Sequence, residues 1–190
     1  DSTVIHPPVE IEKYLPSALS TQLSARKGFI ITGRHVPYKR FDLAIESCNK
    51  LQLPLNVLGT GPETNKLKRL AGPTINFMGY VSDQEIVELL RSAEAFIFPG
   101  LDDFGIAPVA AMAAGTPVIA YKNGGSLDYI VEGKTGIFFD KQTSASLEKA
   151  LQNFSNHNFN ASLIQKAATR FDPATFRQHI RDYISKVKEG

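Results

Sequence analysis

Cysteine and tryptophan are scarce in this chain of 190 residues, which has one cysteine, Cys48, and no tryptophan. A lone cysteine excludes an internal disulfide and fits a reducing compartment. Because Cys48 falls inside a helical pattern, we expect it to pack in the core. No apolar run approaches the ~20 residues that a helix needs to cross a bilayer. The first residues also lack the basic start and apolar run of a signal peptide.

The chain also has no large excess of positive or negative charge, because its 21 lysines and arginines nearly balance its 19 aspartates and glutamates, for a formal net charge of +2. A nucleic-acid-binding protein is expected to carry a strongly basic face, so we expect no nucleic acid partner. The histidines lie far apart at His6, His35, His157 and His179, without metal-ligand spacing, and we expect no metal and no other cofactor. No Gly-x-Ser-x-Gly nucleophile elbow occurs. No Gly-x-Gly-x-x-Gly follows the first predicted strand, which disfavours a dinucleotide dehydrogenase.

What the chain does contain is a regular alternation of short β-branched runs and helical patterns. Its composition, 43% hydrophobic and 21% charged, is that of one globular domain. Strands are predicted at residues 29–32, 55–58, 75–78, 95–98, 117–120 and 137–139. Helices are predicted at about residues 39–51, 62–71, 83–92, 106–114, 127–131, 144–154, 159–170 and 173–188. This pattern indicates an α/β fold with a doubly wound, parallel, six-stranded sheet in the order 3-2-1-4-5-6 and extra C-terminal helices.

Adjacent prolines set the start of the chain apart. Pro7 and Pro8 remove backbone donors and fix φ, so this segment cannot form a helix or a central strand. We interpret residues 1–20 as a linker and residues 21–190 as the domain proper.

The most informative stretch follows the fourth predicted strand, where the acidic turn Asp102-Asp103-Phe104-Gly105 leads into a short helix rich in small residues. The free N–H groups of a helix N-terminus bind anions. The two carboxylates beside them accept hydrogen bonds from hydroxyls, and this combination suits a phosphorylated sugar. The alternative is a plain strand–helix–strand unit in which Asp102 and Asp103 cap the helix.

Further candidate residues follow the other strands, because open parallel sheets bind ligands at the carboxyl ends of their strands. Gly33, Arg34 and Lys39 follow the first strand, and the two cations can meet one anion near a helix start. The alternative is that both cations are solvated surface charges.

Glycines and an aromatic residue follow the next two strands. Gly59 and Gly61 permit close approach of a ligand, or they form a tight turn. Tyr80 and Val81 follow the third strand, where an aromatic ring and exposed amides can receive a base, or where Tyr80 simply packs. Because all these features fall on one edge of the predicted sheet, we favour a ligand site there.

Taken together in register, the motifs over residues 4–140 resemble the donor-binding C-terminal half of GT-B glycosyltransferases, most closely the family-4 retaining glycosyltransferases. The matching segments are His6-Pro7-Pro8-Val9-Glu10, Gly33-Arg34 with Lys39, Gly59-Thr60-Gly61-Pro62, Gly79-Tyr80-Val81-Ser82, Phe104-Gly105-Ile106, Gly115-Thr116-Pro117-Val118-Ile119, Gly124-Gly125 and Glu132-Gly133-Lys134-Thr135-Gly136. The first of these resembles the linker that leaves the family's N-terminal domain.

The resemblance implies a role for each matching residue. Asp102 is the implied catalytic carboxylate, which meets hydroxyls of the donor sugar. The implied diphosphate-binding residues are Arg34, Lys39, Gly105, Ile106 and Ala107. The implied nucleotide- and sugar-binding residues are Gly33, Gly59, Gly61, Tyr80, Val81, Asp103, Phe104 and Ala110.

Ala110 is a departure from the family pattern. The family carries two glutamates separated by seven residues, and the second, which usually accepts from the nucleotide ribose, falls on Ala110. Losing a charged acceptor weakens binding by about 1.5–3 kcal/mol. The site is therefore either weakened or adapted to bind its nucleotide differently.

The resemblance further implies transfer of a hexose, with mannose favoured, from a GDP- or UDP-linked donor to a glycan or lipid-linked acceptor, with retention and without a divalent metal. The acceptor site would belong to an absent N-terminal domain, so we expect the fragment alone to be inactive. A cytoplasmic location is implied, and peripheral association with the inner face of the membrane through the N-terminal half stays open. The alternatives are a non-catalytic nucleotide-sugar-binding or scaffolding domain, and an epimerase or phosphorylase of similar fold.

Overall fold

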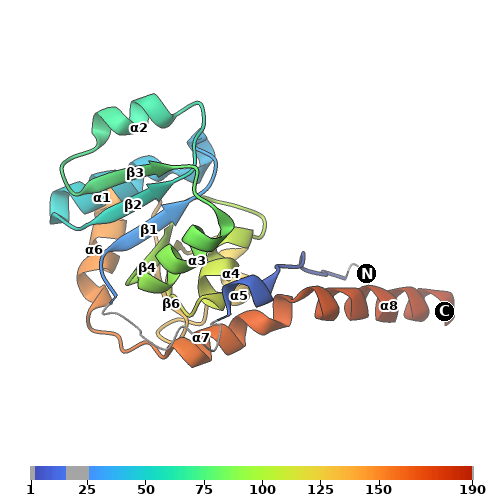
Figure 1. The fold of residues 1–190 in the computed structure, drawn as a ribbon. Coiled ribbons are helices and arrows are strands. Elements are labelled where there is room, and N and C mark those ends of the chain that lie inside the picture. Colours follow the sequence, from blue (N-terminus) through green and yellow to red (C-terminus); the bar gives the residue numbers. More distant parts are fainter. Residues whose placement is uncertain (1–2, 16–25, 190) are drawn as a thin grey trace.

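The computed structural model describes residues 3–15 and 26–189, and its centre is a six-stranded parallel sheet in the order β3-β2-β1-β4-β5-β6. The strands are β1 Phe29–Thr32, β2 Leu55–Leu58, β3 Ile75–Gly79, β4 Ala95–Phe98, β5 Val118–Tyr121 and β6 Gly136–Phe139 (Figure 1). The predicted α/β class, strand number and strand order are confirmed. The proposed boundary between residues 20 and 21 lies outside the described residues.

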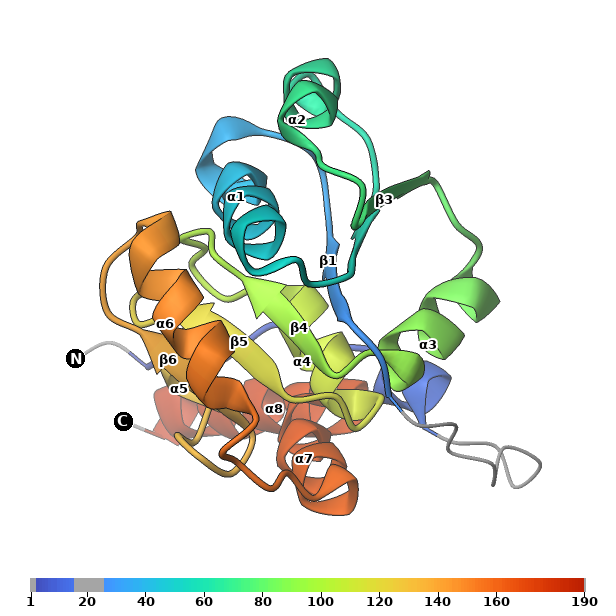
Figure 2. The same cartoon turned by 90° about the vertical axis from the view of Figure 1, so that its left-hand side faces the viewer.

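Helices cover both faces of the sheet. The α-helices are α1 Phe41–Leu51, α2 Thr64–Leu70, α3 Asp83–Ser92, α4 Ile106–Ala113, α5 Ser126–Tyr129, α6 Ser144–Phe154, α7 Ala161–Ala168 and α8 Pro173–Glu189. Short 3-10 helices occur at η1 Ile11–Tyr14, η2 Pro37–Lys39 and η3 Thr169–Phe171. Figure 2 shows α1 and α6 on one side of the sheet and α4 and α7 on the other.

The alternation of side chains along each strand explains this double cover. Phe29 and Ile31 of β1 pack in one core with α1 and α6, whereas Ile30 packs in the other core with α4 and α7. Successive strand residues point to opposite faces, so a strand buried on both faces is apolar throughout. All four residues of β4 are buried for this reason. Cys48 is fully buried in α1, as the sequence predicts, and burial raises its pKa to about 12.

The helix that follows β1 starts later than predicted. The sequence indicates a start near residue 39, but Arg40 adopts a left-handed conformation with φ 53° and separates the 3-10 turn η2 from α1. A capping box formed by Ser82 and Glu85 opens α3.

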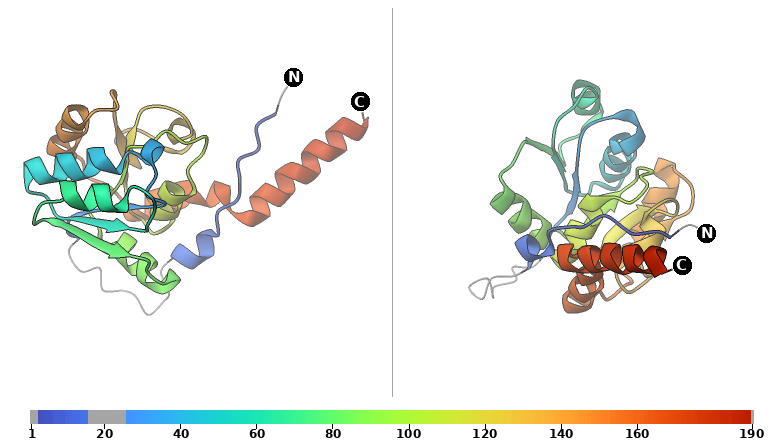
Figure 3. Two further views of the ribbon diagram at one scale, coloured as in Figure 1. Left: turned by 90° about the horizontal axis from the view of Figure 1, so that it is seen from above. Right: turned by 90° about the vertical axis from the view of Figure 1, so that its right-hand side faces the viewer.

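The N-terminal segment pairs with no strand of the described sheet. The Val9 N–H donates to the Phe171 carbonyl at 2.8 Å, and Val9 and Ile11 are buried against the core that contains α4. The short 3-10 turn η1 follows the proline-containing stretch. This segment and α8 leave the body on the same side (Figure 3). No helix of the described residues is long and apolar enough to cross a membrane.

Candidate functional site

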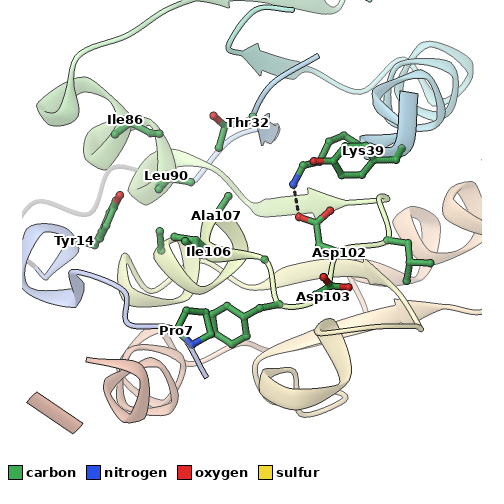
Figure 4. Close-up of a pocket in the computed structure, with 16 residues that line it drawn as sticks. Pro7, Tyr14, Thr32, Lys39, Ile86, Leu90, Asp102, Asp103, Ile106 and Ala107 are labelled. Atoms are coloured by element: carbon green, nitrogen blue, oxygen red, sulfur yellow. Dashed lines mark hydrogen bonds and ion pairs between the residues drawn. The ribbon is translucent and has the colours of Figure 1, made fainter. Parts of the chain in front are cut away.

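A cavity of about 730 Å³ opens at the carboxyl ends of β1 and β4. The residues that line it are Pro7, Tyr14, Thr32, Gly33, Tyr38, Lys39, Ile86, Leu90, Leu101, Asp102, Asp103, Phe104, Gly105, Ile106, Ala107 and Ala110 (Figure 4). They come from the N-terminal segment with η1, the end of β1 and the loop after it, α3, the turn that joins β4 to α4, and α4 itself. The sheet topology thus gathers segments that are distant in sequence, as expected at the edge where two halves of a doubly wound sheet diverge.

An ion pair between Lys39 and Asp102 crosses the cavity (Figure 4). The Lys39 Nζ donates to Asp102 Oδ2, and the two side chains are 21% and 13% exposed. The Asp102 Oδ1 atom is buried and has no hydrogen-bond partner among the described residues. Lys39 Nζ also lies 5.4 Å from the Tyr38 ring centroid and 5.9 Å from that of Phe98. The pair therefore places one positive group at the cavity, while the second carboxylate oxygen of Asp102 is enclosed and has no partner among the described residues.

The N-terminus of α4 faces the same cavity. Gly105 is its N-cap with φ 91°, and no side chain caps the helix. The interpretation of Asp102 and Asp103 as helix caps is therefore wrong. The first-turn amides of Ile106 and Ala107 have no intrahelical partner, while Pro108 at the third position has no N–H. These amides and the helix dipole favour an anion at this point.

Aromatic side chains and a glycine pack against the acidic turn. The Phe104 ring lies 5.3 Å from His6, 5.2 Å from Phe171 and 5.6 Å from Tyr129, between ring centroids. A Cβ at Gly125 would lie 2.4 Å from Phe104 Cα and 2.5 Å from the Asp103 carbonyl oxygen. Gly125 therefore permits the loop after β5 to pack directly on the turn.

Five of the predicted site residues lie outside the cavity lining: Arg34, Gly59, Gly61, Tyr80 and Val81. Arg34 is exposed, and Tyr80 is 88% exposed, so the alternative that Tyr80 packs in the core is wrong. A Cβ at Gly59 would lie 2.1 Å from the Gly33 carbonyl oxygen, and one at Gly61 would lie 2.5 Å from that of His35. These two glycines permit the loops after β1 and β2 to approach each other.

The His35 ring connects these two loops through hydrogen bonds of its nitrogens. Its ring is fully buried, with Nδ1 2.9 Å from Thr64 Oγ1 and Nε2 3.3 Å from the Leu58 carbonyl oxygen. Burial lowers the pKa of His35 below its ordinary value, because the charged imidazolium is poorly solvated there. His35 is therefore a neutral structural residue that fixes the base of the loop carrying Lys39.

Several cavity residues were not predicted from the sequence. Tyr14 and Pro7 reach the site from the N-terminal segment, and Ile86 and Leu90 reach it from α3. None of these four follows a strand, so the expectation that ligands bind at the carboxyl ends of strands does not point to them. Tyr38 and Thr32 do adjoin predicted residues and were within reach of that expectation. No group of three or more His, Cys, Asp or Glu side chains arranged for a metal occurs within the part of the chain that the structure describes.

Comparison with known proteins finds a family model and relatives that match this chain. A family model described as glycosyl transferases group 1 matches residues 21–170. The D-inositol 3-phosphate glycosyltransferase of Streptomyces avermitilis is 24% identical over 88% of this chain and 42% of its own length. The alpha-1,3/1,6-mannosyltransferase alg-2 of Neurospora crassa is 28% identical over 72% of this chain and 29% of its own length. This chain therefore spans less than half of each of these relatives.

Solved structures share the fold. The lipopolysaccharide outer core galactosyltransferase WaaB superposes with a TM-score of 0.81 at 17% identity, over 97% of this chain and 55% of that one. Anabaena HepE in complex with UDP-glucose gives a TM-score of 0.79 at 22% identity, over 97% of this chain and 57% of that one.

The fold is thus that of the Rossmann-like domains of GT-B glycosyltransferases. The chain belongs to the glycosyl transferases group 1 family.

Proposed function

We propose that the intact protein is a retaining, family-4-type hexosyltransferase and that this chain is its donor-binding half. The observation that carries the proposal is the Lys39–Asp102 pair beside the free amides at the α4 N-terminus, within one cavity. A nucleotide-diphosphate sugar has the matching chemistry, because it joins an anion to a group rich in hydroxyls. The Anabaena HepE structures with UDP and UDP-glucose, which share this fold, support a donor of this kind.

In the proposed complex, Lys39 and the amides of Ile106 and Ala107 bind the diphosphate. These groups are fixed before the ligand arrives, and they stabilise the charge that develops on a departing diphosphate. The Asp102 carboxylate accepts a hydrogen bond from a hydroxyl of the donor sugar, with Asp103 beside it at the exposed rim. Lys39 is shared between Asp102 and the phosphate, so donor binding weakens the ion pair without breaking it completely.

The proposed donor is a GDP- or UDP-linked hexose, and the proposed acceptor is a glycan or a lipid-linked sugar. Mannose is the preferred hexose of the proposal, which the similarity to mannosyltransferases of Neurospora crassa and Dictyostelium discoideum supports. We further propose that transfer takes place in the cytoplasm, at the inner face of the membrane, with peripheral association through an N-terminal half.

The proposed linker at residues 1–20 and domain at residues 21–190 require a second domain that completes the cleft. The N-terminal segment and α8 leave the body together (Figure 3). Tyr183, Ile184 and Val187 of α8 are 41%, 47% and 61% exposed. An apolar stripe of this kind supports a neighbouring protein surface at that position. A closed two-domain cleft positions the acceptor and excludes water, so the 190 residues alone are expected to bind donor and transfer nothing.

Calorimetric titration of GDP, UDP, GDP-mannose and UDP-glucose into this chain tests the proposal. Lys39→Ala is expected to weaken binding by about ten- to a hundredfold, because a charged hydrogen bond contributes about 1.5–3 kcal/mol. The matched control is Lys122→Ala, which removes an exposed lysine near the end of β5, outside the cavity. Arg34→Ala tests the proposed second cation and is expected to weaken binding, and unchanged affinity would remove Arg34 from the diphosphate site. Equal affinity for the parent chain and Lys39→Ala would contradict the diphosphate assignment.

A second candidate function is a non-catalytic nucleotide-sugar-binding domain. Ala110 favours it, because alanine stands where the family has a second carboxylate. Assaying transfer after the N-terminal half is supplied separates the two: turnover supports the enzyme, and donor binding without turnover supports the binding domain.

A further inference from the structure

The two ends of the cavity differ in chemistry (Figure 4). One end holds the charged and hydrogen-bonding groups: Lys39, Asp102, Asp103 and the free amides at the start of α4. The other end is lined by Tyr14 of η1, Ile86 and Leu90 of α3, and Ala107 and Ala110 of α4. Leu90 is 1% exposed and Ala110 is 4% exposed, so this second end is a depression in the apolar core.

The chemistry of a nucleotide-diphosphate sugar determines its orientation along such a cavity. This step rests on the proposed function, which supplies the ligand. The diphosphate takes the cation and the amides, because both are fixed near Lys39 and Ile106. The hexose, with several hydroxyls to satisfy, takes the carboxylate end at Asp102 and Asp103. Because the diphosphate and the hexose occupy the polar end, the nucleoside occupies the apolar end, where its base and the carbon face of its pentose can bury apolar surface.

The pentose hydroxyls find little to bond at that end. Among the described residues that line it, no carboxylate or amide side chain occurs, and the polar side-chain groups are the phenol of Tyr14 and, where this end meets the polar end, the hydroxyl of Thr32. A hydroxyl that enters without a partner gives up its hydrogen bonds to water, and removing that hydroxyl costs nothing. A site that hydrogen-bonds a hydroxyl rejects the analogue without it, whereas an apolar site does not.

We infer that this donor site does not select for the ribose 2′-hydroxyl and accepts ribonucleoside and 2′-deoxyribonucleoside diphosphate sugars equally well. The class of donor is then broader than a GDP- or UDP-linked ribonucleotide sugar, and the reason lies at the Ala110 end of the cavity. Sugar recognition then lies at the Asp102 end, and the pentose is held mainly by packing, without a charged hydrogen bond.

Paired titrations of the 190-residue chain with UDP and dUDP, and with GDP and dGDP, test the inference. We expect the two dissociation constants of each pair to agree within about threefold, or the deoxy ligand to bind more tightly, since no carboxylate or amide side chain favours the ribose. A ribonucleotide that binds about tenfold or more tightly than its deoxy counterpart, about 1.4 kcal/mol, overturns the inference and leaves the proposed function standing. Failure of all four nucleotides to bind overturns both.

Ala110→Glu supplies the charged acceptor that this end lacks. The glutamate extends from α4 into the cavity, so UDP is expected to bind about tenfold more tightly while dUDP gains nothing, which creates a ribose preference. Ala110→Met is the matched control, with similar length and no acceptor, and it should leave the UDP to dUDP ratio unchanged. If Ala110→Glu unfolds the chain, the paired titrations of the parent chain and of Ala110→Met still decide. A ribose preference in Ala110→Met equal to that in Ala110→Glu contradicts the assignment of the pentose to this end.

Discussion

Replacing Lys39 with methionine tests the ion pair on which the site depends. The change leaves the Asp102 carboxylate 13% exposed and without its ammonium partner. Removing one member of a fully buried ion pair costs about 3–5 kcal/mol, because an uncompensated charge stays behind. An exposed pair contributes only about 0–1 kcal/mol. Since Lys39 is 21% exposed, we expect the free energy of unfolding to fall by about 1–3 kcal/mol, between these limits.

The matched double variant, Lys39→Met with Asp102→Asn, removes both charges and keeps both shapes. It should recover most of the loss, which gives a coupling free energy of about 1–3 kcal/mol in a double-mutant cycle. Urea unfolding of the parent chain, the two single variants and the double variant at pH 7 measures this coupling. Losses that simply add in the double variant would refute the conclusion that the two side chains stabilise each other.

Three further predictions follow from the packing around the site. Gly125→Ala should lower the free energy of unfolding by about 1–3 kcal/mol through overpacking against Phe104, and an unchanged urea midpoint would contradict that contact. His35 has a lowered folded-state pKa, so the unfolded chain binds the extra proton and the contribution of His35 to stability is lost as the pH falls below about 6.5. His35→Gln should therefore show a smaller loss of stability between pH 7.5 and pH 5 than the parent chain, and equal losses would refute the assignment. Cys48, with a pKa of about 12, should react with a thiol reagent at pH 8 only when the chain unfolds, as mass spectrometry of native and urea-treated samples would show.

The sheet could be predicted from the sequence because its signals are local. Each strand is a short apolar run between helical patterns, and the predicted bounds of β1, β2 and β4 agree with the structure. The acidic turn and the start of α4 were also found, because the rule that ligands bind at strand ends applies to any parallel sheet.

The rest of the cavity could not be predicted because its causes are long-range. Tyr14 lines the site only because η1 packs against α4, some ninety residues further along the chain. Gly59 and Gly61 carry the same local signal whether a ligand or a backbone approaches them, and here they face the loop that contains Gly33 and His35. Arg34 adjoins the site in sequence, but its side chain direction depends on the turn at residues 33–35, which no local pattern specifies.

The measurement that tests the central claim most directly is a nuclear magnetic resonance titration of the isotopically labelled chain with GDP-mannose and UDP-glucose. If the donor diphosphate binds at the start of α4, the largest amide shifts at saturation will fall on Gly105, Ile106 and Ala107, and the Lys39 side-chain resonances will move with them. Saturable binding that leaves these three amides and Lys39 unchanged, while amides elsewhere shift, would contradict the account.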